Sequence, residues 1–196
     1  MADGSRSSSS RDASLTSTPA WKYWILPSIA DLIFVALLAA LVFTPLSVKL
    51  LGDAGIGWHI RTGQLILSTQ TIPPVDPFSS QIQKPWVAWE WLYDIAVGLL
   101  QAAWGLNGVV WFTAVVIAAV FGWTFRLLVA RGTNLFVALV LVLLAMSAST
   151  IHFLARPHVL SWLFTFAWFW ILDSTERSVF QEQRALVRAG CGPYHA

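Results

Sequence analysis

Charged side chains are scarce in this chain. Asp, Glu, Lys and Arg make up only 11% of its 196 residues, whereas 57% are hydrophobic. Soluble domains carry about a quarter charged residues, so this composition excludes a soluble globular fold. Together with a mean hydropathy of +0.65, it predicts a polytopic membrane protein, in which each spanning helix needs roughly 20 apolar residues. The chain has room for a handful of such helices and their loops, but for no large soluble domain.

Cysteine is almost absent as well. Cys191 is the single one, which excludes an internal disulfide and a cysteine-rich metal site. The net charge is +2, but the Lys and Arg residues are scattered and form no stripe that could track phosphates. We therefore expect no nucleic-acid partner. No ligand cluster is visible, so the sequence predicts no cofactor and leaves a divalent metal open.

What the sequence has in abundance is apolar runs of membrane-crossing length. They predict an all-α transmembrane domain over residues 23–175 with about four spans. The spans are expected at Trp24–Val48, Gly108–Val129, Leu135–Ile151 and Val159–Leu172. The last run covers roughly 21 Å at the helical rise. We expect that helix to continue past Asp173 or to cross a thin region of the bilayer.

The flanking segments predict the orientation. Residues 1–22 are Ser-rich and without an apolar run, which is typical of a disordered tail. Arg6, Arg11 and Lys22 precede the first span, so the amino terminus is predicted to be cytoplasmic in the inner (plasma) membrane. The first apolar run is too long for a signal peptide, and we expect it to stay as an anchor.

Because successive spans cross the membrane in alternating directions, the cytoplasmic amino terminus also assigns the remaining segments to one side of the membrane or the other. Residues 49–107 form an extracytoplasmic loop, and residues 176–196 form a second cytoplasmic tail. The end of that tail, Arg184–Ala196, has no membrane period, and a premature end of the coding sequence would fall there.

The segment Trp86–Gly105 is long enough to cross the membrane but carries polar side chains. Glu90, Asp94 and Gln101 fall near one helical face. A carboxylate-bearing face opposite an aromatic one is typical of a helix that lies in the membrane interface. We therefore predict a helix lying flat in the membrane interface on the outer side, with its acidic face solvated. The alternative is a fifth span, which would invert everything after it.

A polar stretch, Gly52–Ser80, opens the predicted outer loop. Within it, Gly57–Ser68 is expected to form a short helix. Thr71–Ser80 contains three prolines and is expected to be a rigid extended turn, because each proline fixes its own φ and disfavours a helical predecessor. The sequence thus predicts two surface helices joined by a proline-rich turn.

This arrangement resembles the N-terminal half of the GT-C superfold of membrane glycosyltransferases, in which an acidic residue follows the first span. Asp53 has that position, "EWLYDIAVGLLQAAWGLNGVVWFTAVVIAAVFGWTFRLLVARG" looks like the surface helix, Gly-containing break and second span, and "FLARPHVLSWLF" looks like the second outer loop. The resemblance covers about Pro27–Leu172. It implies transfer of a hexose or pentose from a polyprenyl-phosphate donor in the cell envelope, with membrane lipid and that donor as partners.

Such transfer requires a carboxylate base and cations for the departing phosphate. Asp53 is the candidate base, since partial burial at the end of a span would raise its pKa. Arg is preferred for a bidentate phosphate contact. The candidate substrate-binding residues are His59, Arg61, Glu90, Arg156 and His158. No metal ligand is predicted.

Each candidate also has an ordinary structural interpretation. Asp53 can be a cap or turn residue, and Asp76, before a proline, can form a turn. The candidate Arg and His side chains can contact lipid headgroups. Asp31 lies near the cytoplasmic end of the first span, where its charge can reach the interface, so it receives no site role.

Two other functions fit the composition. One is a small non-catalytic membrane subunit or scaffold, with other membrane subunits as partners and the 12 tryptophans making helix or lipid contacts. The other is a haem-binding redox subunit that uses His59, His152 or His158. The loop position of His152 and His158 disfavours the redox subunit, because haem ligands in a bundle project from facing helices.

Overall fold

The computed structural model describes residues 28–80 and 85–188, and these are helical apart from their loops and one isolated Val75–Pro85 bridge. The predicted all-α class is therefore confirmed for this part of the chain. Residues 1–27, with the predicted amino-terminal tail, and residues 189–196, with Cys191, lie outside it. The helices are α2 (Ile29–Phe43), α3 (Leu46–Leu50), α4 (Gly55–Thr69), α5 (Trp91–Ala130), α6 (Leu135–Ser149), the 3-10 turn η1 (Thr150–His152) and α7 (His158–Arg188).

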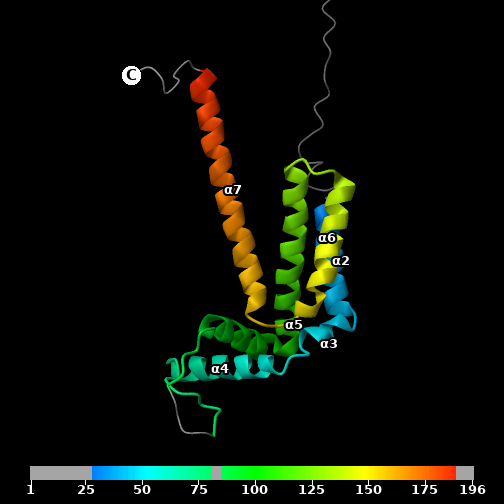
Figure 1. Cartoon of the computed structure of the whole chain (residues 1–196). Coiled ribbons are helices and arrows are strands. Elements are labelled where there is room, and N and C mark those ends of the chain that lie inside the picture. The colour runs from blue at the N-terminus through cyan, green and yellow to red at the C-terminus, as the bar shows by residue number, and fades with distance from the viewer. Residues whose placement is uncertain (1–27, 81–84, 189–196) are drawn as a thin grey trace, which may run out of the picture.

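The helices form two layers that cross (Figure 1). The second part of α5 stands upright between its neighbours and packs against α2, α6 and α7. Helix α7 diverges from α5 toward its C-terminal end. Helix α4 and the first part of α5 lie side by side across the lower end of the upright helices. Below, the first part of α5 together with α4 is called the crosswise pair.

The crosswise turn of α5 occurs at Gly105. This residue has φ 65° and ψ −161° inside an otherwise helical run. Such a conformation is open essentially only to glycine, because any Cβ would clash with the backbone. The Gly-containing break expected from the sequence is thus present. The surface helix predicted over Trp86–Gly105 begins at Trp91 and ends at this bend.

The polar stretch after α3 folds largely as predicted. The helix expected over Gly57–Ser68 lies within α4, and no helix forms between Thr71 and Ser80. In that turn the Phe78 amide donates to Asp76 Oδ1 at 2.9 Å, so Asp76 acts as a turn former.

The first apolar helix is shorter than predicted within the described residues. A capping box between Ser28 and Asp31 starts α2 there, and Thr44 and Pro45 follow its last residue. Proline cannot donate a backbone hydrogen bond and disfavours a helical residue before it. The helix therefore ends at Phe43, and the predicted C-terminal end of the span becomes the separate helix α3.

Within residues 28–80 and 85–188, two helical segments are long and apolar enough to cross a membrane, Trp91–Ala130 and Leu135–His152. The second is only 11% buried, so its apolar side chains are mostly exposed, unlike those of a soluble core helix. Helix α2 is apolar but shorter. Helix α7 continues past Asp173 without a break and becomes polar, so the predicted continuation is confirmed, and residues 176–188 are helical.

Candidate functional site

The crosswise pair is held in backbone contact by two glycines. A Cβ added to Gly63 on α4 would lie 1.8 Å from the carbonyl oxygen of Asp94 on α5. Gly98 faces the same point, since its added Cβ would be 3.3 Å from Gly63 Cα. Small residues allow helix backbones to approach this closely. The side chains beside the crossing are therefore fixed relative to one another.

One of these side chains is His59, which pairs with Asp94. The Nδ1 atom of His59 lies 2.7 Å from Asp94 Oδ1, and the Asp94 side chain is only 1% exposed. On the same face of α5, Gln101 accepts a hydrogen bond of 2.7 Å from Gln64. The predicted solvated acidic face is therefore wrong for Asp94. Helical spacing shows which residues share a face, but not that a second helix covers it.

Two polar atoms remain enclosed without a partner in the described part of the chain. They are the Tyr93 hydroxyl and the second carboxylate oxygen of Asp94. The Tyr93 ring packs edge-on against His59, with ring centroids 5.4 Å apart. A buried polar group without a partner is costly, so the crossing holds polar groups whose hydrogen-bonding capacity is unused within the described residues.

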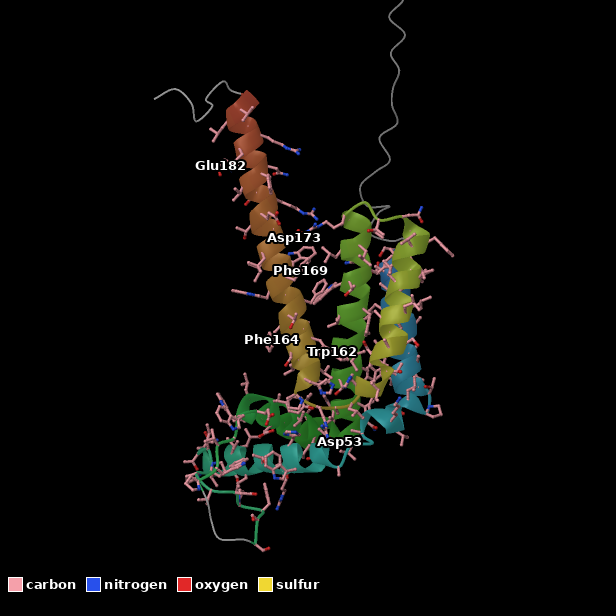
Figure 2. All side chains as sticks on the ribbon, viewed as in Figure 1. Asp53, Trp162, Phe164, Phe169, Asp173 and Glu182 are labelled. Atoms are coloured by element: carbon pink, nitrogen blue, oxygen red, sulfur yellow. The ribbon has the colours of Figure 1, made fainter. Side chains whose placement is uncertain are left out.

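The second part of the site joins two loops that are distant in the sequence. Asp53 lies between α3 and α4, and Arg156 lies between η1 and α7. The Arg156 guanidinium forms a bidentate ion pair with the Asp53 carboxylate. Arg156 Nη2 donates to Asp53 Oδ1 at 2.6 Å, and Arg156 Nε donates to Asp53 Oδ2. A backbone hydrogen bond of 2.8 Å from Ala155 to Leu50 ties the same loops together. Figure 2 shows Asp53 where the crosswise pair meets the upright helices.

The Arg156 contact decides the electrostatics of Asp53. Its hydrogen bond lowers the pKa of Asp53 and outweighs burial, which acts in the opposite direction; the Gly55 amide and His59 lower the pKa further. The pKa of Arg156 is raised in turn by Asp53. The expected upward shift of the Asp53 pKa is therefore wrong, because the sequence does not show the arginine from the other loop. Asp53 stays ionised and is a weaker base.

The structure thus brings together three of the predicted site residues, Asp53, His59 and Arg156. Asp94 and Tyr93 join them, although the sequence analysis gave neither a site role. The signal that could have indicated Asp94 is the pairing of a His on one amphipathic helix with an acidic residue on the next.

The other three predicted residues make their contacts elsewhere. Arg61 is exposed and donates to Gln64 at 3.1 Å. Glu90 is exposed at the N-cap position of α5 and makes no capping hydrogen bond. His158 lies 2.8 Å from the His152 carbonyl oxygen through Nε2. These contacts give no support to a shared binding role.

Further ion pairs lie at the opposite end of the upright helices. Asp31 pairs with Arg126 at 2.6 Å, in line with its expected position at a helix end. Asp173 is buried and pairs with both Arg131 and Arg177. Figure 2 shows that Asp173 on α7 lies far from Asp53, which is near the crosswise pair. The sequence analysis did not predict the Asp173 contacts.

Neither metal ligation nor a known relative identifies the site. Within residues 28–80 and 85–188, no group of three or more His, Cys, Asp or Glu side chains could hold a metal ion. Comparison of the chain with family models, curated proteins and solved structures finds no match. The function must therefore be argued from the site itself.

Proposed function

We propose that this chain is an integral protein of the inner membrane with four spans and a cytoplasmic amino terminus. In this arrangement the crosswise pair lies on the outer surface, and Arg156 contacts the phosphate of a sugar donor. The GT-C resemblance implies that this donor is a polyprenyl-phosphate sugar. The observation that carries the proposal is the bidentate contact between Asp53, in the loop before α4, and Arg156, in the loop before α7. The buried His59 lies beside it.

The distribution of charge along the upright helices supports the membrane position. The ion pairs of Asp31 and Asp173 lie at one end of these helices, and that of Asp53 lies at the other. Between them the upright part of α5 is uncharged over roughly 27 Å, which is close to the hydrocarbon thickness of about 30 Å. The uncharged stretches are residues 32–43, 108–125, 135–149 and 159–172.

The geometry of Arg156 suits a phosphate. Its planar guanidinium offers two parallel N–H groups, which match two oxygens of either a carboxylate or a phosphate. Asp53 occupies this fork, yet 48% of the Arg156 side chain remains exposed. A donor phosphate can therefore share the guanidinium or displace the carboxylate. Asp53 then acts chiefly to hold Arg156 at the membrane surface.

The test measures sugar transfer in membrane vesicles from cells that carry only the variant chain. The donors are a polyprenyl-phosphate hexose and a polyprenyl-phosphate pentose, each radiolabelled in the sugar. Removing one charge-stabilising donor costs on the order of 10²-fold in rate, so Arg156→Ala should lose about that much. Arg61→Ala is the matched control, because Arg61 is also exposed but donates its hydrogen bond to Gln64. Unchanged transfer in both Asp53→Asn and Arg156→Ala would reject the site.

A non-catalytic membrane subunit is the second candidate, and the shape of the molecule between α5 and α7 favours it. An apolar cleft of about 490 Å³ lies there, lined in part by Trp123, Phe166 and Trp170. A helix of another subunit could fill it. This function predicts that Trp170→Ala weakens crosslinking between α7 and neighbouring membrane proteins, and that Arg156→Ala does not.

A further inference from the structure

The orientation of the His59 ring follows from its contact with Asp94. An ionised carboxylate only accepts hydrogen bonds, so Nδ1 must carry the proton that it shares with Asp94 Oδ1 at 2.7 Å. The neutral ring then has its lone pair on Nε2. A buried carboxylate that holds an imidazole in this tautomer also stabilises the imidazolium once the ring accepts a second proton, as in hydrolytic triads.

The Nε2 atom is open to a substrate. It makes no hydrogen bond to a described residue, and it is not among the enclosed polar atoms without a partner. About a tenth of the side chain, 11%, remains exposed. Trp58 and Tyr93 pack edge-on against the ring, with centroids 5.3 Å and 5.4 Å from it. The ring is therefore held in place while one nitrogen stays accessible.

The groups around His59 show that Asp53 and His59 are suited to different roles. The titratable and charged groups that face it are Asp94 and Tyr93 on α5 and Asp53 in the loop before α4, with Arg156 bound to Asp53. Both carboxylate oxygens of Asp53 accept hydrogen bonds from the Arg156 guanidinium. The imidazole is the group of the cluster with a ring nitrogen, Nε2, that no described residue engages.

We propose that His59 accepts the proton of the acceptor hydroxyl during sugar transfer and that Asp94 is its positioning residue. This inference rests on the proposed function. The acceptor oxygen forms a bond to the anomeric carbon of the sugar, and the bond from that carbon to the phosphate oxygen breaks. Polyprenyl phosphate leaves with the electron pair and remains opposite Arg156. The hydroxyl proton passes to His59 Nε2, and the imidazolium later releases it to water.

The test uses the full chain in the same membrane vesicles and donors as above. A positioned general base contributes about 10²–10⁴-fold to a rate, so His59→Ala should lower transfer by that range. Added imidazole should restore part of the activity, which a structural defect would not allow. His152→Ala is the matched control, because His152 is an exposed histidine in η1, and it should transfer like the wild type. Asp94→Asn should transfer more slowly and shift the rising limb of the pH–rate profile.

A second variant and a binding measurement distinguish loss of chemistry from loss of folding. His59→Gln can still donate to Asp94 but is not a base, so it should bind radiolabelled polyprenyl phosphate like the wild type and yet fail to transfer. Full transfer by His59→Gln, or failure of imidazole to rescue His59→Ala, overturns the role of His59 and leaves the proposed function standing. A wild-type chain that neither binds polyprenyl phosphate nor transfers sugar overturns both.

Discussion

The crosswise pair and helix α7 contrast in how they bury their side chains. In the crosswise pair, Thr62 and Val97 are fully buried and polar side chains pair with one another across the glycine crossing. On α7, Phe164 and Trp168 are 63% and 64% exposed. The facing sides of the pair are thus covered by contacts within the chain, whereas these apolar side chains of α7 have no such cover.

This difference indicates which part of the chain can fix the positions of site residues relative to one another. Buried polar contacts specify one arrangement because each partner loses its water. Apolar contacts with lipid do not select one arrangement in this way. The residues proposed to act on substrate accordingly lie on or beside the crosswise pair, and α7 contributes through the loop that precedes it.

The largest expected loss of stability comes from a substitution at the point where Gly63 and Gly98 bring α4 and α5 into contact. In Gly63→Ala the new methyl group meets the Asp94 carbonyl, and overpacking of this kind costs about 3 kcal/mol. Helix α4 should move away from α5 and the His59–Asp94 contact should be lost. Unfolding in mixed detergent micelles measures the cost. Gly57→Ala is the control on the same helix, since nothing lies within 4 Å of its added Cβ, and equal stability losses in the two variants would contradict the crossing.

A smaller effect is expected at the bend that separates the crosswise pair from the upright helices. Gly105 has a positive φ, and a residue with a Cβ pays about 2 kcal/mol in such a region. Gly105→Ala should straighten α5 and increase the distance between spin labels on α4 and α7. Asn107→Ala, at a helical position beside the bend, should leave that distance unchanged. An unchanged distance in Gly105→Ala would argue against a bend held by this glycine.

The glutamine pair tests whether polar contacts specify the crosswise arrangement. Gln101→Leu leaves the Gln64 amide without its partner at 2.7 Å, and a lost hydrogen bond of this kind costs about 1 kcal/mol. Gln64→Leu should cost a similar amount. The double substitution should cost less than the sum of the two single ones in a double-mutant cycle. Strict additivity would show that the contact contributes no coupling.

The smallest effect concerns pH. The pKa of Asp53 is lowered from its ordinary value of 3.8, chiefly by the Arg156 hydrogen bond. A group with a lowered pKa in the folded state stabilises above its unfolded pKa and loses that contribution as the pH falls through its folded pKa. The Asp53–Arg156 contact should therefore persist to below pH 3.8 and then open. Carboxyl-carbon NMR should detect this, and Arg156→Ala should return the Asp53 pKa toward its ordinary value.

Much of the fold could be predicted because it depends on local chemistry. The helix over Gly57–Ser68, the proline turn after it and the break at Gly105 follow from backbone preferences of the residues themselves. The early end of α2 is also local, and Pro45 was the available signal. The number of four spans remains a prediction, since two segments in the described part of the chain meet the length and hydropathy of a span.

The site could be predicted only in part, because its chemistry depends on distant residues. Asp53, His59 and Arg156 were chosen from residue type and from their predicted position next to spans, and the structure brings them together, while their role remains a prediction. The sign of the Asp53 pKa shift was wrong, since burial and an arginine act in opposite directions and only the first was foreseen. Asp94 was expected to face solvent, because periodicity does not show which element covers a face.

The sequence by itself determined that this chain is helical and strongly apolar, and it indicated the proline turn and the break at Gly105. These properties follow from hydropathy and from the φ preferences of proline and glycine. Only the tertiary structure decided that α4 covers Asp94 and that Arg156 holds Asp53. Both contacts join residues far apart in the chain, and their free energies arise only once packing has brought the partners together and removed their water.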